Sequence, residues 1–407
     1  MNVANPVPPY NVLMLAPTMF FADYGAHVRI LEEATSLRAL GHRITILAYP
    51  NGRDIAGLDV IRCWGVPFNY RIIVGSSRHK FYLDVMLGLK SLEAMVRVKP
   101  DIVHAHLHEG ALIGGVLSKL WRVPLIFDFQ GSMTSEMIDH HFLEPDSALY
   151  RPLYWLEKQI DRLPDAVITS SRNAANLLRT EFGRTDGKVH TISDCVDPQA
   201  FHPDVLSPEE RAALRARYGI PADAQVVVYL GILQDYQGIP HLIRAARPVL
   251  EQRPNTYFMI MGFPNEARYR QLAESVGVSD RILLPGLVPR EQNPSHLALG
   301  DIAAAPKLSA TEGAAKLLYY MAMALPVVAF DTPVSQEYLG EWGMCAEPGS
   351  VEHLAQCILA LLDDPEGARR RGQRLRERVL ERYTWVQGGK RIAEVYQSVC
   401  PRPRSVL

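Results

Sequence analysis

Short apolar runs alternate with longer amphipathic stretches along nearly the whole chain, and this alternation constrains the fold more than any other feature. The first instance is the apolar run 11–17, the stretch 25–40 that ends at Gly41, and the apolar run 43–49. Within 25–40 the apolar side chains recur at helical spacing, and Glu32, Glu33 and Arg38 lie off the face that they form. Strand, helix, glycine and strand in this order form a βαβ unit, which requires a parallel sheet with a right-handed crossover.

The same alternation runs twice through the chain, in two separate series. Further runs that predict strands are 101–106, 124–129, 165–170 and 188–193 in the first series, and 225–231, 256–262, 281–286, 301–306 and 326–330 in the second. A proline-punctuated segment with a polar helix at 207–219 connects the two series.

We therefore predict an α/β protein with two Rossmann-like, doubly wound parallel-sheet domains that face a central cleft. The expected domains are 1–205 and 206–385, followed by a helix within 386–407 that is a candidate to cross back to the first domain.

Composition excludes several classes of protein. The 407 residues suffice for two domains, and 43 basic against 44 acidic side chains give no field that favours nucleic acid. The five cysteines form no CxxC pair, so neither a disulfide framework nor a zinc ribbon is indicated. No signal peptide is visible, and the longest apolar stretch, 319–330, is too short to span a bilayer. We expect a cytoplasmic protein.

In doubly wound sheets, ligands bind beyond the carboxyl ends of the strands. Glycines there let the backbone approach a phosphate or a sugar, and helix N-termini favour anions. Gly25, Gly231 and Gly262 stand at such positions, and His27 follows at the start of a predicted helix. Ordinary turn chemistry is the alternative explanation for each single glycine.

Polar residues gather after two neighbouring strands of the first series. His104, His106 and His108 alternate along the chain, so as strand residues they would share one face, and Asp128 and Gln130 end the next strand. A metal site is one interpretation, because imidazole is a common ligand. A polar pocket for ligand hydroxyl groups and purely structural histidines are the alternatives.

Several motifs resemble those of retaining glycosyltransferases of family 4. They are GHRITILAY, DIVHAH, ISDCVDPQAFHP, VVVYLGIL, MGFP, PGLVP and KLLYYMAMALPVVAF, and they occur in the family's order from about residue 11 to 396. The resemblance implies the GT-B fold, a nucleotide-sugar donor held mainly by the second domain, and an acceptor held mainly by the first. It also implies that no metal ion and no cofactor is needed.

The chain departs from the family pattern at the donor site. Ile232 and Gln237 stand where the family has an arginine and a lysine that neutralise the leaving diphosphate. Thr311 and Tyr319 stand where it has two glutamates that hold donor hydroxyls, and Glu312 is one residue out of register. The lost charge-assisted contacts are worth about 1.5–3 kcal/mol each.

Two further positions complete the comparison. Gln130 stands where the family often has a histidine, and Lys316 is a candidate to supply the missing positive charge. Because residues three apart share a helix face, Lys316 should point where Tyr319 points. We also expect His106, Gln130 and Gly25 on the cleft wall of the first domain.

The predicted site residues fall into three groups, and none is assigned to a metal. They are Gln130, His106 and Glu312 as catalytic residues; Gly231, Gln237, Gly262, Lys316, Tyr319 and Thr311 as donor-binding residues; and Gly25, His27, His104, His108 and Asp128 as acceptor-binding residues.

The predicted function is transfer of a sugar from an activated donor, a nucleoside-diphosphate sugar, to a hydroxyl of a glycan or glycolipid. A diverged GT-B protein that binds sugar, nucleotide or a partner without transfer is one alternative, and another GT-B sugar enzyme such as an epimerase is a second. Basic and apolar residues at 71–82 make peripheral contact with the inner face of a membrane a further hypothesis.

Overall fold

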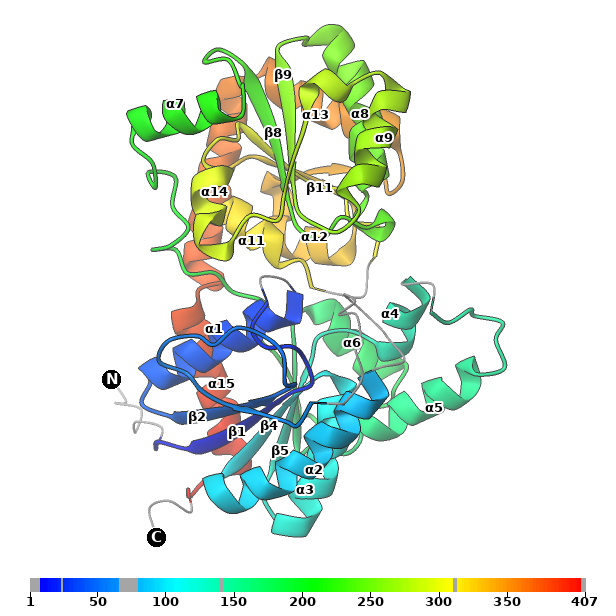
Figure 1. Cartoon of the computed structure of the whole chain (residues 1–407), viewed down its shortest axis with the longest axis vertical. Helices are drawn as coiled ribbons and strands as arrows, with labels where there is room; N and C mark the ends of the chain where they lie inside the picture. Colours follow the sequence, from blue (N-terminus) through cyan, green and yellow to red (C-terminus); the bar gives the residue numbers. More distant parts are fainter. Residues whose placement is uncertain (1–7, 23–24, 66–79, 140–141, 310–312, 404–407) are drawn as a thin grey trace. The chain divides into compact units, whose positions relative to one another are not determined.

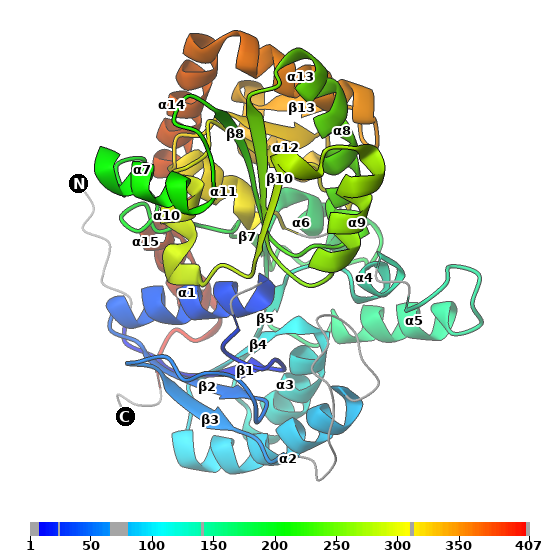
Figure 2. The same cartoon turned by 45° about the horizontal axis from the view of Figure 1, so that its top comes forward.

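The computed structural model describes residues 8–22, 25–65, 80–139, 142–309 and 313–403. The chain forms two compact units (Figures 1 and 2). The first is built mainly from Met1–Ser193 and Trp385–Leu407, and the second from Asp194–Thr384. Both are parallel α/β sheets covered by helices, as the strand–helix alternation predicts.

The sheet of the first unit has the order β3-β2-β1-β4-β5-β6-β7, and its described pairs are all parallel. Its strands are β1 (Asn11–Ala16), β2 (Arg43–Ala48), β3 (Asp59–Arg62), β4 (Ile102–His106), β5 (Leu125–Phe129), β6 (Ala166–Thr169) and β7 (Val189–Thr191). The strand order reverses between β1 and β4, and such a switch point is where doubly wound sheets bind ligands.

The helices of the first unit divide between the two faces of the sheet (Figure 2). They are α1 (Gly25–Ala39), α2 (Lys80–Val98), α3 (Leu107–Trp121), α4 (Met133–Asp139), α5 (Tyr150–Ile160), α6 (Arg172–Thr180) and α15 (Trp385–Val399). Apolar side chains of β1, β4 and β5 pack with those of α2 and α3 on one face. Helices α1 and α15 lie side by side on the other (Figure 1).

The C-terminal helix α15 belongs to the first unit. A Cβ on Gly389 would lie 2.9 Å from Cβ of Ser36, so the glycine lets α15 approach α1 closely. The hydroxyl of Tyr10 donates to the carbonyl of Cys400 at 2.7 Å. Val196 donates a backbone hydrogen bond to Tyr383 and forms a parallel β-bridge with Thr384, the residue just before α15. Residues 194–205 belong to the second unit, like Tyr383 and Thr384.

The second unit has the strand order β10-β9-β8-β11-β12-β13. Its strands are β8 (Gln225–Leu230), β9 (Thr256–Met261), β10 (Ile282–Gly286), β11 (Ile302–Ala305), β12 (Val327–Phe330) and β13 (Met344–Ala346). Its helices are α7 (Pro208–Arg217), α8 (Ile239–Gln252), α9 (Glu266–Val276), α10 (Asn293–Leu297), α11 (Ala315–Ala322), α12 (Pro333–Leu339), α13 (Val351–Asp363) and α14 (Pro365–Arg382).

Helices α8, α9 and α13 pack on one face of this sheet, and α11, α12 and α14 pack on the other. The order reverses between β8 and β11, which makes the carboxyl ends of these strands the second expected ligand position. Among the helices that the structure describes, none is both long enough and apolar enough to cross a membrane.

Candidate functional site

Five buried polar side chains lie together on the α1 face of the first sheet. His104 and His106 alternate along β4 and therefore project to the same side, and Asp128 of β5 pairs with His106 in register. Arg29 and Glu33 are four residues apart on α1 and present one helix face to this cluster. All five side chains are at most 5% exposed, so each charged group needs a partner of opposite charge or a hydrogen-bond partner inside the protein.

Arg29 connects the two carboxylates. Its guanidinium donates to both oxygens of Asp128 at 2.8 Å and lies 3.0 Å from Oε1 of Glu33. A further bond to the carbonyl of Ile192, at 3.2 Å, ties it to the end of β7. Burial alone would raise the pKa of Asp128, but the Arg29 charge and the bond to His106 outweigh burial and hold that pKa well below its usual range. Asp128 is therefore an ionised, immobile carboxylate.

Asp128 in turn orients Gln130 and His106. The Gln130 amide donates to Oδ2 of Asp128 at 2.8 Å, and Nδ1 of His106 lies 3.2 Å from the same oxygen. An ionised carboxylate only accepts hydrogen bonds, so Nδ1 of His106 is the donor to Asp128. Gln130 is partly exposed, whereas His106 has no exposed surface. The cluster thus presents the Gln130 amide at the carboxyl end of β5.

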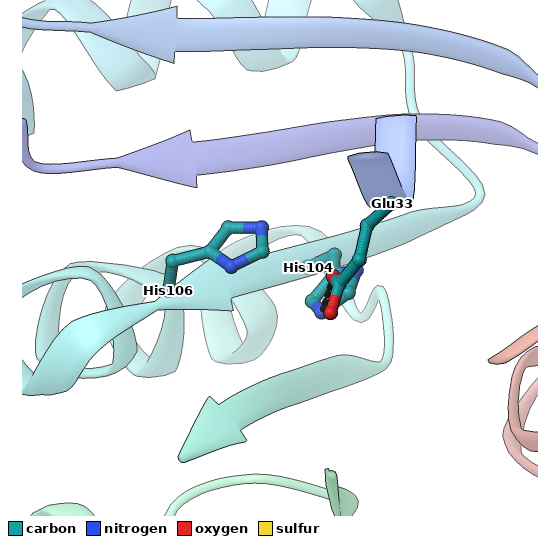
Figure 3. A group of neighbouring side chains, drawn as sticks. All are labelled: Glu33, His104 and His106. Carbon is teal, nitrogen blue, oxygen red and sulfur yellow. Dashed lines mark ion pairs between the residues drawn. The ribbon is translucent and has the colours of Figure 1, made fainter. Parts of the chain in front are cut away.

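His104 and His106 stack with ring centroids 4.6 Å apart (Figure 3). Nδ1 of His104 is 2.8 Å from the hydroxyl of Tyr396 on α15, and its Nε2 lies 3.7 Å from Oε2 of Glu33. Burial lowers the pKa of His104 well below its usual value, with the neighbouring His106 and Arg29 acting in the same direction. His104 is therefore neutral near pH 7.

The expectation that His108 shares the face of His104 and His106 is wrong. Strand β4 ends at His106, and Leu107 turns the chain at φ 58° so that His108 is already helical. Its imidazole packs edge-on against Phe127 and Phe129 at 5.2 and 5.4 Å. These rings alternate with Asp128 and face the opposite side of the sheet.

His108 belongs instead to a second buried group. Its Nε2 lies 3.4 Å from Oδ1 of Asp161 and 3.6 Å from Oε1 of Glu157. Burial would lower the pKa of His108, but the Asp161 and Glu157 carboxylates raise it to about 9. Glu157 also accepts from the backbone N–H groups of Met133 and Thr134 at 2.8 and 3.0 Å. This ion pair therefore anchors the start of α4, just after Gln130.

At the beginning of α1, Gly25 has φ 49°, and no described atom lies within 4 Å of the Cβ that it lacks. His27 is 5% exposed, and burial together with the Lys80 charge lowers its pKa to about 4. The neighbouring residues 23–24 lie outside the described part of the chain. Gly25 is therefore exposed at the start of α1, whereas the His27 side chain is buried and neutral near pH 7.

In the second unit, two glycines that follow β8 and β9 allow close approach of neighbouring atoms. A Cβ on Gly262 would lie 1.7 Å from the carbonyl oxygen of Gly231, and a Cβ on Gly231 would lie 2.8 Å from Nζ of Lys316. Both glycines have φ near 150°, which L side chains rarely adopt. Only glycine at both positions lets the backbones and Lys316 approach so closely.

Lys316, in the first turn of α11, is held at this place. Its Nζ donates to Oε1 of Gln237 at 2.7 Å and to the hydroxyl of Tyr229 at 2.8 Å, and it lies 4.3 Å from the centre of the Tyr229 ring. Lys316 and Tyr319 are both partly exposed, whereas Leu317, Leu318 and Tyr320 are buried, as expected for two residues on one helix face. Their contacts differ, because the Tyr319 ring stacks on Phe201 at 4.5 Å.

The remaining predicted residues, Thr311 and Glu312, lie outside the described residues. Sequence reasoning missed Glu33, which it placed off the buried helix face but which has no exposed surface. It also missed Tyr229, Glu157 and Tyr396. The four-residue spacing from Arg29 to Glu33 was a usable signal, whereas the tyrosines follow the ordinary apolar pattern and gave none.

Two groups among the described residues have the donor atoms and spacing to hold a metal ion. They are Glu33, His104 and His106, and His108, Glu157 and Asp161. In each group one ligand atom per residue lies within 4.8 Å of the others. In the second group the Glu157 carboxylate is already committed to α4, so the first group is the better candidate.

Comparison with known proteins identifies the class. Residues 24–200 match the profile of Glycosyltransferase Family 4, and residues 210–378 match that of Glycosyl transferases group 1. The two parts of the chain therefore belong to these families, and the protein is a GT-B glycosyltransferase of the family 4/group 1 type.

Particular relatives span nearly the whole chain. Alpha-D-kanosaminyltransferase of Streptomyces kanamyceticus is 24% identical over 398 residues, which cover 96% of this chain and 95% of that protein. Sucrose-phosphate synthase from Thermosynechococcus elongatus has a similar structure, with a TM-score of 0.81 at 20% identity, covering 95% of this chain and 98% of that one. HepE of Anabaena, solved with UDP-glucose, gives a TM-score of 0.77 at 18% identity, with 96% and 100% covered.

Proposed function

We propose that the protein transfers a sugar from a nucleoside-diphosphate sugar to a hydroxyl group of a glycan or glycolipid, with retention of anomeric configuration. The observation that carries the proposal is the placement of Lys316 between Gln237 and Tyr229, beside two glycines at the carboxyl end of β8. The class of the protein and the UDP-glucose bound by the similar HepE support a donor of this type.

Lys316 would replace the cations that the family resemblance places at Ile232 and Gln237. Its ammonium group is 2.7 Å from Gln237, so positive charge returns close to one of the two altered positions. It also stands in the first turn of α11, where the helix dipole favours an anion. A donor diphosphate lying over Gly231 would meet both the ammonium group and a backbone without side chains.

On the acceptor side we assign Gln130 to contact with the substrate and the buried residues behind it to positioning. Asp128 and Arg29 hold the Gln130 amide, and His106 supports Asp128 without reaching the surface. Gly25 leaves the start of α1 open for the acceptor.

An amide neither gives nor takes a proton at neutral pH, so Gln130 would act through hydrogen bonds alone. In the proposed step the acceptor oxygen bonds to the anomeric carbon while the bond from that carbon to the phosphate oxygen breaks. The acceptor proton passes to the departing phosphate. Lys316 would stabilise the charge that develops on that phosphate.

One observation bears on each of the two alternative functions, binding without transfer and epimerisation. Binding without transfer is favoured by the residues Ile232 and Gln237, which are uncharged where the family resemblance implies an arginine and a lysine. An epimerase would need a carboxyl group that exchanges protons with the sugar, and Asp128 is unsuited to this because it is buried and clamped in its ionised form by Arg29.

Peripheral membrane contact remains a separate proposal. Most of the basic and apolar segment 71–82 lies outside the described residues, but Phe81 and Tyr82 at the start of α2 are 69% and 52% exposed. Flotation with vesicles that contain anionic lipid tests it: the chain should float, and Phe81→Ser with Tyr82→Ser should stay in solution. Equal flotation of both proteins would contradict the proposal.

Calorimetric titration with nucleotide sugars at one fixed salt concentration tests the donor assignment. Lys316→Ala should weaken binding of the preferred donor by at least about tenfold, because one charge-assisted hydrogen bond is worth about 1.5–3 kcal/mol. Lys307→Ala, which removes a buried lysine from the loop just before α11, should change affinity much less. Equal donor affinity in the wild type and Lys316→Ala would remove Lys316 from the site.

A further inference from the structure

The two stacked histidines of β4 each have a ring nitrogen whose hydrogen bonding is not satisfied by the described residues. Nε2 of His104 and Nε2 of His106 are buried, and neither has a hydrogen-bond partner among the residues that the structure describes. A buried polar atom without a partner costs free energy, and native proteins rarely tolerate two side by side. Some further species is therefore needed at this place.

The tautomers define what that species must be. Asp128 accepts from Nδ1 of His106, and in the neutral tautomer with that proton Nε2 of His106 offers its lone pair. Nδ1 of His104 is engaged by the Tyr396 hydroxyl at 2.8 Å. The two Nε2 atoms and a carboxylate oxygen of Glu33 lie within 4.8 Å of one another, and Figure 3 shows both rings on the same side of β4 with Glu33 reaching toward them. When Nδ1 of His104 is the donor to the Tyr396 oxygen, all three of these atoms offer lone pairs, and this arrangement fits a cation.

The Glu33 carboxylate completes the group. Nε of Arg29 lies 3.0 Å from Oε1 of Glu33, and Oε2 of Glu33 lies 3.7 Å from Nε2 of His104. Glu33, His104 and His106 have no exposed surface, so a cation bound between them would be enclosed by protein groups.

We propose that Glu33, His104 and His106 form a structural binding site for a divalent transition-metal ion, and that the ion is zinc. Two imidazoles and one carboxylate are a usual zinc ligand set, whereas magnesium and calcium prefer oxygen alone. Zinc–ligand bonds of about 2.0–2.2 Å require each ligand atom to move by only about 1 Å or less.

The surroundings supply the second layer of contacts that zinc-bound histidines usually have. The other ring nitrogen of such a histidine donates a hydrogen bond to a carboxylate or another polar group, and this bond fixes the orientation of the ring. Here Asp128 does this for His106 and Tyr396 does it for His104. Oε1 of Glu33 remains in its ion pair with Arg29, so Oε2 is the oxygen that would bind the metal. The ion would lock β4, α1 and α15 together and takes no part in the proposed sugar transfer.

Metal analysis of the full chain, expressed in zinc-supplemented medium and purified without chelator, tests the site. We expect about one zinc per chain, because a buried site fills during folding. Glu33→Gln and His104→Phe should each retain less than about one-tenth of that amount. His42→Phe is the matched control: His42 is also buried and also touches the Tyr396 ring, but its Nδ1 accepts from the backbone of Tyr10, and this variant should keep its zinc.

Two further measurements keep the proposal testable if the ligand variants do not fold. The wild type grown with cobalt in place of zinc should show visible absorption bands of a bound ion. Tyr396→Phe should lose zinc to a competing chelator at a concentration about 10-fold lower, as removal of a second-layer contact does. Less than about 0.1 zinc per wild-type chain, or equal zinc in the wild type, Glu33→Gln and His104→Phe, would overturn the site and leave a buried water as the occupant.

Discussion

At the scale of single residues, buried charge determines most of the site. Arg29 forms ion pairs with both Asp128 and Glu33, which was only partly predictable because charged side chains on a helix usually face solvent. Helical spacing therefore placed Glu33 on the wrong face. His108 was misplaced for a different reason, since strand alternation holds only up to the last strand residue, His106.

The Arg29–Asp128 pair should matter far more for stability than a surface pair of the same type. Asp128→Asn should lower the free energy of unfolding by about 3–5 kcal/mol, because it leaves a buried guanidinium without its main partner. Asp54→Asn, which removes the 83% exposed partner of Arg62, should cost at most about 1 kcal/mol. Urea denaturation of both variants measures the contrast, and similar losses would mean that the Arg29 cluster is not closed to water as described.

Asp84 on α2 makes stability depend on pH. Burial and the nearby Glu109 charge raise its pKa to about 7, although the Tyr49 hydroxyl bonds its carboxylate. The folded state therefore keeps a proton that the unfolded chain loses between about pH 4 and pH 7, so this group's contribution to stability decreases as pH rises through that window.

Asp84→Asn should remove this loss and stabilise the protein at pH 8 by on the order of 1 kcal/mol. Asp146→Asn, at an exposed position, serves as the control and should leave the pH dependence unchanged. Thermal unfolding from pH 5 to 8 measures both. An unchanged slope in Asp84→Asn would show that Asp84 is ionised throughout.

At the scale of elements, the alternation of apolar runs predicted the inner strands to within about two residues. Strands β4, β5, β8 and β12, for example, lie inside the expected ranges because strands covered on both faces are apolar throughout. The edge strands β3 and β13, of four and three residues, were missed, because they are short and only partly buried and so lack that pattern.

Helix α15 offers a direct test of its packing on α1. Gly389→Ala should destabilise the protein, because the added Cβ would lie 2.9 Å from the Ser36 side chain and force the helices apart. Gly88→Ala on α2 is the matched control: its Cβ would meet Ile113 at an ordinary 3.9 Å, so the usual gain of about 0.5–1 kcal/mol for alanine in a helix is expected. Opposite signs in chemical denaturation support the packing, and equal gains would contradict it.

At the scale of the whole molecule, the resemblance of ordered motifs predicted the GT-B class that the family profiles and similar structures confirm. The contact on which the proposed donor site depends could not be predicted from the sequence alone. Lys316 donates a hydrogen bond to Gln237, which lies 79 positions away along the chain. A contact between residues so far apart in the sequence is visible only when the chain is folded.

The most direct test of the proposed function is the release of nucleoside diphosphate from a panel of nucleotide sugars, followed over hours without added acceptor. We expect one donor to be hydrolysed slowly, with a rate at least about 10-fold lower in Lys316→Ala, since each 1.36 kcal/mol of lost stabilisation costs a factor of ten. Lys307→Ala should stay close to the wild type. Tight binding of a nucleotide sugar with no turnover of any donor, or equal turnover in the wild type and Lys316→Ala, would contradict sugar transfer through this lysine.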